Sequence, residues 1–371
     1  MLVVGEASGD IHGAHLVQAL QERDAKLKVY GVAGEQLQQT QFEVLVSVSK
    51  LTGMGLVELA GNLRNIWNAY RVLRRALRER RPNLLVLVDF PEFNLRLARL
   101  AKSLQIPVLY YVSPQIWAWR AGRIRQIAKR VDQMAVAFPF EVPLYERYGI
   151  PVTFVGHPLL DIVRVKQGRE PVLRKLGMET TKPVIAVLPG SRQKELAYHL
   201  PVMLESAVRL RREREVQFFC VKASTVERSD IEAFLDQNSV KISIVEEDRY
   251  DAVNAADLVW VASGTATLET ALLLKPMIVM YRVSPITFGL ARLLVSVDYI
   301  AMANIVAGKR IVPELVQADL NPERLLNESR SILDDTEIRE AMIHNLAKVR
   351  NKLGSPGAAK RVAEIAASMM S

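Results

Sequence analysis

Short apolar runs alternate with longer amphipathic stretches along almost the whole chain, and this alternation restricts the fold more than any other feature. Such a pattern is typical of repeated βα units, whose strands pair in parallel. In the first half the predicted strands are Leu2 to Val4, Lys28 to Val32, Leu84 to Val88, Val108 to Val112, Gln133 to Ala137 and Val152 to Val155. In the second half they are Val184 to Leu188, Gln217 to Val221, Lys241 to Val245, Leu258 to Val261 and Met277 to Tyr281. The sequence therefore predicts an α/β protein built on parallel sheets.

A turn signal, Gly156-His157-Pro158, separates the two series of predicted strands, and a charged segment from Arg164 to Lys175 follows it. The length of 371 residues suits about two domains of ~150 residues each. We expect one domain over 1–157 and a second over 158–354. Both should be doubly wound and Rossmann-like, and they should face each other across a cleft with ligands at the carboxyl ends of the strands.

Composition excludes several classes of protein. No segment approaches the ~18 uninterrupted apolar residues of a membrane span, and Met1 to Glu6 lacks the basic region that opens a signal peptide. The first strand begins almost at Met1, so either it is short or the natural start lies upstream. A single cysteine, Cys220, excludes an intrachain disulfide and a multi-cysteine metal site, and its apolar neighbours predict core packing. We expect a reduced, cytoplasmic protein.

The charge of the chain calls for an anionic partner. The formal net charge is +9 and the pI is near 9.6. Seven arginines lie between Arg64 and Arg81, against one acidic residue, Glu79. In this stretch apolar residues recur at helical spacing, at Leu63, Ile66, Tyr70, Leu73 and Leu77. Four of the arginines, Arg64, Arg71, Arg75 and Arg78, fall on a different arc of the same predicted helix. The pattern fits a helix lying on anionic lipid and equally an ordinary packed surface helix. Nucleic acid fits less well, because no basic segment is interleaved with stacking aromatics.

The segment Ser263-Gly-Thr-Ala-Thr-Leu-Glu269 follows an apolar run and opens a predicted helix from Leu268 to Leu274. Its small residues, Ser263, Gly264, Thr265, Ala266 and Thr267, would let backbone N–H groups at a helix N-terminus approach a phosphate. Glu269, one turn into the helix, is placed to accept hydrogen bonds from a ribose diol. The alternative is that Ser263 or Thr265 caps the helix and that Glu269 complements its dipole.

Two further features follow predicted strands of the first half. Gly5-Glu6-Ala7-Ser8-Gly9-Asp10 combines a tight turn with a helix start that suits a phosphate, although Ser8 or Asp10 also fits a plain N-cap. Asp89 ends an all-apolar strand, where a carboxylate is costly to bury. It is therefore a candidate general base, and its alternative role is an N-cap for the next helix.

Three more candidates complete the set. Trp117, Trp119 and Arg120 follow the predicted strand that ends at Val112, and the tryptophans suit either stacking on sugar or acyl groups or core packing. Arg192, in the turn Leu188-Pro-Gly-Ser-Arg192, suits a bidentate contact to a pyrophosphate or a surface ion pair. Asn304 is a polar residue in an apolar, loop-like setting.

The five histidines show no metal-ligand spacing, since His12 and His15 have no further histidine or cysteine nearby. We therefore expect no metal. The sequence also lacks a Gly-x-Ser-x-Gly elbow, the motif that would indicate a catalytic triad.

Taken in order, these motifs resemble the lipid A disaccharide synthases, bacterial glycosyltransferases that join two acylated glucosamines. The resemblance covers nearly the whole chain, through Gly5-Glu-Ala-Ser-Gly-Asp10, Gly53-Met-Gly55, Asp89-Phe-Pro-Glu-Phe-Asn94, Tyr111-Val-Ser-Pro-Gln-Ile-Trp-Ala-Trp-Arg120, Val155-Gly-His-Pro158, Leu188-Pro-Gly-Ser-Arg192, Ala262-Ser-Gly-Thr-Ala-Thr-Leu-Glu269 and Asn304-Ile-Val-Ala-Gly308. The first and fourth of these strings are the most discriminating.

The resemblance implies a GT-B fold, with an acceptor-binding first half, a donor-binding second half and a C-terminal helix, about 355–371, that packs back on the first domain. It implies transfer of 2,3-diacylglucosamine from UDP to the 6-hydroxyl of 2,3-diacylglucosamine 1-phosphate, with inversion, without metal or cofactor. The implied catalytic residues are Asp89, as the base, Arg192 and Asn304. The implied donor contacts are Gly190, Ser191, Arg192, Ser263, Gly264, Thr265, Ala266, Thr267 and Glu269. The implied acceptor contacts are Glu6, Ser8, Gly9, Asp10, Ser113, Trp117 and Arg120.

A lipid-borne acceptor implies a cytoplasmic protein associated peripherally with the inner membrane, and it favours the lipid-facing interpretation of the arginine-rich segment. The resemblance leaves a homodimer open. Two rival functions also stay open. One is a UDP-N-acetylglucosamine 2-epimerase, which shares the architecture, and the other is a non-enzymatic peripheral membrane sensor of sugar nucleotides.

Overall fold

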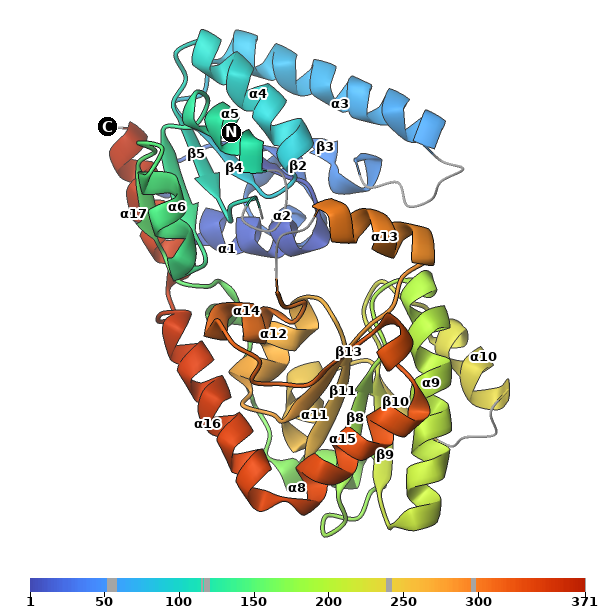
Figure 1. Ribbon diagram of the computed structural model, residues 1–371. Coiled ribbons are helices and arrows are strands. Elements are labelled where there is room, and N and C mark those ends of the chain that lie inside the picture. The colour runs from blue at the N-terminus through green and yellow to red at the C-terminus, as the bar shows by residue number, and fades with distance from the viewer. Residues whose placement is uncertain (52–58, 115, 117–120, 238–241, 295–297, 371) are drawn as a thin grey trace. The chain divides into compact units, whose positions relative to one another are not determined.

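Two parallel sheets organise the molecule, each at the centre of its own unit (Figure 1). The computed structural model describes residues 1–51, 59–114, 116, 121–237, 242–294 and 298–370. One unit comprises Met1–Asp161 and Leu353–Ser371, and the other comprises Ile162–Lys352. The turn at Gly156-His157-Pro158 thus immediately precedes the division. The fold is that of two Rossmann-like domains, as predicted.

The strands of the first unit form a seven-stranded parallel sheet in the order β3-β2-β1-β4-β5-β6-β7. Their bounds are β1 (Leu2–Val4), β2 (Val29–Ala33), β3 (Phe42–Ser47), β4 (Leu85–Val88), β5 (Val108–Tyr111), β6 (Gln133–Val136) and β7 (Val152–Phe154). Strands β1, β4 and β5 are buried at every position, because helices cover both faces of the sheet.

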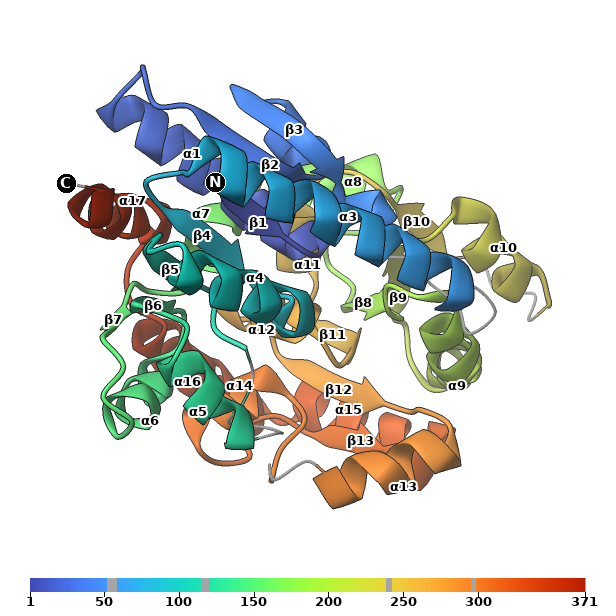
Figure 2. The same cartoon turned by 90° about the horizontal axis from the view of Figure 1, so that it is seen from above.

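The helices of this unit are α1 (Ala7–Arg23), α2 (Glu35–Gln38), α3 (Leu59–Arg80), α4 (Pro91–Ser103), α5 (Ile124–Ala128), α6 (Val142–Glu146), α7 (Leu159–Ile162) at the boundary and α17 (Ala358–Met370), with short 3-10 turns η1 (Val48–Lys50), η2 (Ala121–Arg123) and η3 (Pro139–Glu141). Helices α3 and α4 lie side by side (Figure 2), and α17 packs on α1. Pro91 opens α4, where its missing N–H needs no partner.

Helix α3 buries most of the apolar arc that the sequence analysis considered for lipid contact. Leu73 and Leu77 are fully buried, and Ile66 and Tyr70 pack against the same core. The prediction that this arc faces lipid is therefore wrong for these four residues, because they complete the core of their own unit. The side chains of Arg71, Arg74, Arg75 and Arg78 are exposed.

The second unit contains a six-stranded parallel sheet in the order β10-β9-β8-β11-β12-β13. Its strands are β8 (Val184–Leu188), β9 (Gln217–Val221), β10 (Ser243–Val245), β11 (Leu258–Ala262), β12 (Met277–Tyr281) and β13 (Glu314–Val316). Its helices are α8 (Arg169–Lys175), α9 (Gln193–Glu213), α10 (Arg228–Gln237), α11 (Arg249–Ala255), α12 (Thr265–Leu272), α13 (Pro285–Leu294), α14 (Met302–Ala307), α15 (Pro322–Asp334) and α16 (Thr336–Lys352), with the 3-10 turn η4 (Gln317–Asp319). Helix α9 packs with α15, and α11 packs with α8.

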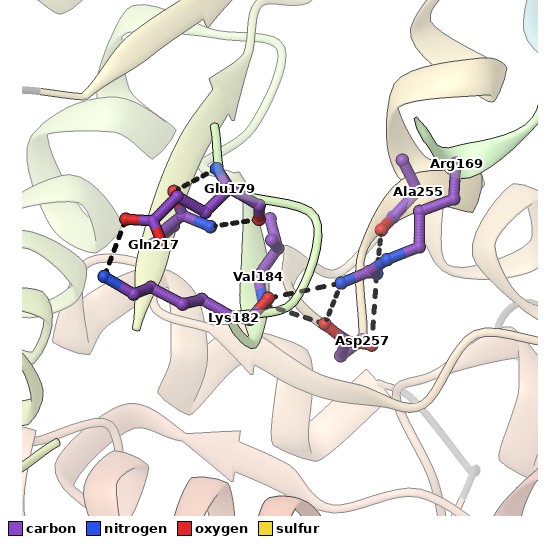
Figure 3. Close-up of polar contacts among 7 residues, drawn as sticks. All are labelled: Arg169, Glu179, Lys182, Val184, Gln217, Ala255 and Asp257. Carbon is purple, nitrogen blue, oxygen red and sulfur yellow. Dashed lines mark hydrogen bonds and ion pairs between the residues drawn. The ribbon is translucent and has the colours of Figure 1, made fainter. Parts of the chain in front are cut away.

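A polar network fastens the amino edge of this second sheet (Figure 3). Asp257, just before β11, accepts hydrogen bonds from both guanidinium NH2 groups of Arg169, at 2.9 and 3.1 Å, and from the backbone N–H of Val184 at 2.8 Å. Gln217 joins the loop before β8 by bonds of 2.8 and 2.9 Å to the backbone of Glu179. These residues hold strand ends together at the edge opposite to the carboxyl ends of the strands, so we regard them as structural.

Every strand predicted from the sequence is present, with ends that differ by at most two residues from the prediction. The prediction missed β3 and β13, which are both edge strands. Strand β3 is largely exposed or half-buried and β13 has three residues. Glu43 interrupts the apolar residues of β3, and β13 contains only Leu315 and Val316 as apolar residues, so neither segment has a long apolar run.

Candidate functional site

The loops after β1 and β4 lie together at the carboxyl edge of the first sheet. The chain leaves β1 toward β2 and β3, whereas β4 leads toward β5, so the order of strands reverses between these two neighbours. Such a switch point is where doubly wound folds bind ligands. A Cβ atom on Gly5 would lie 2.1 Å from the Cβ of Phe90, so only glycine allows the two loops to pack this closely. Glu6 and Asp89 follow in these loops.

Asp89 occupies a strained and half-buried position in this switch point. Asp89 and Phe90 have φ angles of 51° and 46°, in the left-handed region that non-glycine residues seldom adopt. The Asp89 carbonyl accepts hydrogen bonds from Asn94 Nδ2 at 2.6 Å and from the Tyr110 hydroxyl at 2.5 Å, which hold this backbone in place. Burial, with the negative charge of Glu6 nearby, raises the pKa of the Asp89 carboxyl to about 6. A carboxylate with this pKa is mostly ionised at neutral pH and can accept a proton.

The predicted acceptor residues at the start of α1 differ in their surroundings. Asp10 is buried, and its carboxylate accepts hydrogen bonds from the backbone N–H groups of Gly34 at 2.7 Å, Gln36 at 2.8 Å and Leu37 at 3.3 Å. Asp10 therefore caps α2 and not α1, and its oxygens are already used. Gly9 is buried against Val88, and Ser8 is half-buried.

Ser113 follows β5 in the same unit and is also engaged. It is buried, and its hydroxyl donates a hydrogen bond to Glu141 Oε1. Glu141 is itself buried, and its other oxygen accepts a bond of 3.1 Å from the backbone N–H of Phe138. Glu141 is a site residue that the sequence analysis missed, since nothing in its local pattern indicates that its partner lies 28 residues earlier. Trp117 and Arg120, with Gly53 and Gly55, lie outside the described residues.

The second sheet has its own switch point, between β8 and β11. The chain leaves β8 toward β9 and β10 and leaves β11 toward β12 and β13, so the loops 189–192 and 263–264 are neighbours. Gly190 and Gly264 have φ angles of 131° and 151°, which require glycine. A Cβ on Gly264 would meet no described atom within 4 Å, so the space beside this loop is open.

Arg192, in the loop after β8, carries an exposed charge, and Glu195, in the first turn of α9, holds this loop. The carboxylate of Glu195 accepts a bond of 2.8 Å from the backbone N–H of Ser191, and a Cβ on Gly190 would lie 2.5 Å from the same oxygen. Among the residues that the structure describes, the Arg192 side chain makes only a long contact of 3.5 Å to Glu195, and 67% of the side chain is exposed. Its exposed guanidinium could reach an anion, and the pyrophosphate contact stays a prediction.

His199 supports this loop from α9 and was also missed by the sequence analysis. Its Nδ1 lies 2.9 Å from the Pro189 carbonyl, and its Nε2 accepts a hydrogen bond of 3.1 Å from the backbone N–H of Arg282. Only a neutral imidazole with the proton on Nδ1 satisfies both contacts. Burial lowers the pKa of His199, which favours that neutral form. No local pattern in the sequence indicates this role, because the partner Arg282 lies 83 residues away.

The loop after β11 leads directly into α12. Gly264 and Thr265 are exposed and Ala266 is half-buried. The first N–H groups of a helix have no intrahelical partner, so this exposed turn offers donors to an anion. Thr267 is fully buried and its hydroxyl donates to the Gly264 carbonyl at 2.7 Å, which makes it a structural part of the turn. The Ser263 hydroxyl contacts the Ile300 carbonyl at 3.4 Å.

Glu269 lies in the next turn of α12, and its side chain is 13% exposed. Its Oε1 accepts hydrogen bonds from Arg249 at 2.7 Å and from the Tyr250 hydroxyl at 3.0 Å. Both partners belong to α11 and were absent from the predicted site.

Asn304 makes the largest number of side-chain hydrogen bonds that one amide can make. It is fully buried, its oxygen accepts from the backbone N–H groups of Ile311 and Val312, and its nitrogen donates to the Val312 carbonyl and to Glu314. An amide has two acceptor and two donor positions, so none remains for a substrate. Asn304 holds the loop that joins α14 to β13.

Over the described ranges, no group of three or more histidine, cysteine, aspartate or glutamate side chains could hold a metal ion. Among the same residues, no helix is long and apolar enough to span a membrane.

Comparison with protein families matches residues 1–368 to the family described as lipid-A-disaccharide synthetase. The chain is 43% identical over 371 residues to the lipid-A-disaccharide synthase of Geobacter sulfurreducens, and the match covers all of this chain and 97% of that protein. It is 44% identical over 371 residues to the enzyme of that name from Syntrophotalea carbinolica, of which it covers 95%.

Solved structures with similar folds are much more distant in sequence. The UDP-GlcNAc 2-epimerase of Neisseria meningitidis, bound to UDP-GlcNAc, has a TM-score of 0.68 at 15% identity, with 99% of each chain covered. The MurG protein of Acinetobacter baumannii has a TM-score of 0.60 at 16% identity, with 99% of this chain and 98% of that chain covered. At these identities the likeness concerns the fold alone.

Proposed function

The chain belongs to the lipid-A-disaccharide synthetase family, and we propose that it forms the lipid A disaccharide by inverting glycosyl transfer. The donor is UDP-2,3-diacylglucosamine and the acceptor is 2,3-diacylglucosamine 1-phosphate. Their products are the β-1,6-linked disaccharide 1-phosphate and UDP. In this proposal the first unit binds the acceptor and the second unit binds the donor.

The raised pKa of the Asp89 carboxyl, at the switch point of the first sheet, is the observation that supports this mechanism. Its carboxylate takes the proton of the acceptor 6-hydroxyl, and that oxygen forms a bond to the anomeric carbon of the donor. The bond from this carbon to the UDP oxygen breaks, and UDP leaves with the electron pair. Inversion requires the base and the leaving group on opposite faces of the sugar. A pKa of about 6 keeps Asp89 ionised at neutral pH and basic enough to assist the attack.

Fixed donors of the second unit stabilise the leaving UDP. The exposed Arg192 guanidinium suits the pyrophosphate, since it can form two parallel hydrogen bonds. The exposed N-terminal turn of α12, from Gly264 to Ala266, adds backbone N–H donors and the positive end of the helix dipole. Charge that develops on the departing oxygen is stabilised by groups already in place.

Four of the predicted site residues act as positioning residues in this proposal: Asp10, Ser113, Thr267 and Asn304. Their side-chain polar atoms are engaged within the protein, so each holds a loop of the site and makes no side-chain contact to substrate. Among the described residues, Glu6 and the backbone around Ser8 and Gly9 remain as proposed acceptor contacts. Trp117 and Arg120 also stay predicted acceptor contacts.

The epimerase alternative has weaker support. Epimerases resemble this chain at about 15% identity, whereas the lipid-A-disaccharide synthases reach above 40% over the full length. An epimerase acts on a soluble sugar nucleotide, for which an arginine-rich surface has no use.

We also propose that the exposed face of α3 docks the protein on the inner membrane, where the acceptor is carried. This face joins Arg71, Arg74, Arg75 and Arg78 to Trp67, whose side chain is 57% exposed. Arginines attract anionic headgroups, and tryptophan favours the boundary between headgroups and acyl chains. The docking surface is thus different from the apolar arc first considered.

The decisive experiment supplies the purified protein with UDP-2,3-diacylglucosamine and 2,3-diacylglucosamine 1-phosphate in detergent. We expect the disaccharide 1-phosphate and UDP in equal amounts, measured by mass spectrometry and nucleotide release. Asp89→Asn should reduce turnover by ~100- to 10,000-fold while UDP affinity stays close to that of the wild type.

Asp24→Asn is the matched control, since Asp24 is an exposed residue after α1 that accepts one backbone hydrogen bond, which asparagine can also accept. It should keep full turnover. If Asp89→Asn retained more than about a tenth of the wild-type turnover, a different base would be required. Conversion of UDP-N-acetylglucosamine without an acceptor would instead favour the epimerase, and no product from any substrate would favour the sensor.

A further inference from the structure

Arg249 and Tyr250 hold one oxygen of the Glu269 carboxylate. Arg249 Nη2 donates to Glu269 Oε1 at 2.7 Å and to the Tyr250 hydroxyl at 2.6 Å, and that hydroxyl donates to Glu269 Oε1 at 3.0 Å. The three side chains therefore form a closed triangle around a single acceptor atom.

The topology brings these side chains to the ligand-binding edge of the sheet. Arg249 and Tyr250 are the first residues of α11, which follows β10, and Glu269 belongs to α12, which follows β11. Because the strands are parallel, the loops after β10 and β11 leave from the same carboxyl edge. The triangle thus lies on the side of the sheet that carries the turn from Ser263 to Thr267.

The other oxygen of Glu269 is left for a ligand. Oε2 accepts no hydrogen bond from any residue that the structure describes, and the side chain keeps 13% of its surface exposed. A carboxylate oxygen with free lone pairs is a strong acceptor for hydroxyl groups.

Tyr250 contributes a donor that does not change with pH in the neutral range. Burial, together with the Glu269 charge, raises the pKa of Tyr250 to about 12, so its hydroxyl keeps its proton. The Arg249 guanidinium lies 4.7 Å from the centre of the Tyr250 ring, a cation–π contact that restricts its motion. Both donors are therefore fixed before any ligand binds.

We propose that Arg249 and Tyr250 are positioning residues that orient Glu269, so that its second carboxylate oxygen accepts hydrogen bonds from the ribose hydroxyls of the UDP donor. This inference rests on the proposed function, in which the second unit binds UDP. It assigns a role in nucleotide recognition to two residues outside the predicted site.

The test compares two probes, UDP and 2′,3′-dideoxy-UDP, by calorimetry. In the wild type, removal of the ribose hydroxyls should weaken binding roughly 10- to 100-fold, since hydrogen bonds to a charged group are lost. The quantity compared is the ratio of the dissociation constant for 2′,3′-dideoxy-UDP to that for UDP. In Tyr250→Phe and in Arg249→Ala this ratio should fall to within about 3-fold, as in Glu269→Ala. Arg249→Lys keeps a cation near Oε1 and should restore part of the ratio. Tyr250→Phe should also raise KM for the sugar nucleotide and leave kcat within about 3-fold.

Arg228→Ala is the matched control, because Arg228 forms exposed ion pairs with Glu232 and Glu246 on α10 and the following strand region. It removes the same charge from the same unit and should keep the wild-type ratio. A purely structural role, or a direct contact of Arg249 with the pyrophosphate, would weaken both nucleotides equally and leave the ratio unchanged.

The inference is overturned if Tyr250→Phe and Arg249→Ala keep the full ratio while Glu269→Ala loses it; the donor site itself would then stand. If the wild type bound UDP and 2′,3′-dideoxy-UDP equally well, the result would contradict both the ribose contact of Glu269 and this inference. The glycosyl transfer assay would still decide the proposed function separately.

Discussion

Asp89 combines burial, a left-handed backbone and an acidic neighbour in one residue. The left-handed φ angle is unfavourable for a non-glycine residue. Partial burial and, to a smaller extent, the negative charge of Glu6 raise the pKa of the carboxyl to about 6. Hydrogen bonds from Asn94 and Tyr110 to its carbonyl maintain the strained backbone. A raised carboxyl pKa at a switch point supports the proposed role of Asp89 as the base.

The pKa of Asp89 predicts the pH dependence of the reaction. As the base, Asp89 must be ionised, so kcat/KM should fall as the pH drops below about 6. Loss of the Glu6 charge removes a repulsion that raises this pKa. In Glu6→Gln the acid limb of the profile should therefore move to lower pH, whatever happens to the maximal rate.

Glu22→Gln provides the comparison, because Glu22 lies at the other end of α1, ~24 Å along the helix from Glu6. Its profile should coincide with that of the wild type. An acid limb that stays at the same pH in Glu6→Gln would show that Glu6 does not influence the base.

For other residues, hydrogen-bond partners within the protein decide whether a polar side chain is free to contact a ligand. Asp10, Ser113 and Asn304 have the chemistry expected of ligand contacts, but each is buried and hydrogen-bonded within the protein. Glu195 and His199 look ordinary in the sequence, yet they shape the loop that carries Arg192.

At the scale of elements, α3 illustrates the two faces of an amphipathic helix. Leu73 and Leu77 complete the core, whereas Trp67 and the arginines are exposed. Arg75 forms an exposed ion pair with Glu79 four residues later, which contributes little to stability. The exposed face is thus open to a role outside the unit.

A triple variant tests that role. Arg71→Ser, Arg75→Ser and Arg78→Ser together should reduce sedimentation with anionic vesicles at low salt, since each arginine near the surface contributes about 1 kcal/mol. Added salt should weaken wild-type binding in the same way. Turnover of detergent-solubilised substrates should be unchanged, because these side chains lie away from the catalytic loops.

Arg209→Ser, Arg212→Ser and Arg324→Ser remove three exposed arginines from the second unit and serve as the control for net charge. That variant should bind vesicles like the wild type. Equal vesicle binding by both triple variants would assign α3 a structural role only.

At the scale of the whole molecule, the last helix belongs to the first unit although the chain reaches it from the second. Asp161 accepts hydrogen bonds from the backbone N–H groups of Gly357 at 2.6 Å and Ala358 at 3.1 Å, so it caps α17. Arg361 donates to the Val155 carbonyl at 2.8 Å. Val362 and Ala366 are fully buried in the core of that unit.

Asp161→Ala should therefore destabilise the first unit by about 1 to 3 kcal/mol, since two N–H groups at a helix start lose their acceptor. Hydrogen exchange followed by mass spectrometry should show less protection in α1 and α17 and unchanged protection in α9. Asp161→Asn keeps one acceptor oxygen and should have a smaller effect. Equal loss of protection in both units, or none, would contradict this role of Asp161.

The sequence by itself determined the two parallel sheets, all of their strands except β3 and β13, and the family. Fully buried strands require continuous apolar runs, and phosphate-binding turns require small residues, so both leave a local record in the sequence. Gly190 and Gly264 lie in such turns, and their φ angles of 131° and 151° favour glycine.

Only the tertiary structure decided what each polar side chain contacts. Glu141 lies 28 residues from Ser113, and Arg249 lies 20 residues from Glu269, so no local pattern connects these partners. The same holds for α3, where packing against α4 and the sheet selected which apolar residues are buried. Hydrogen bonding and burial depend on neighbours that are distant in sequence, and chain topology alone brings them together.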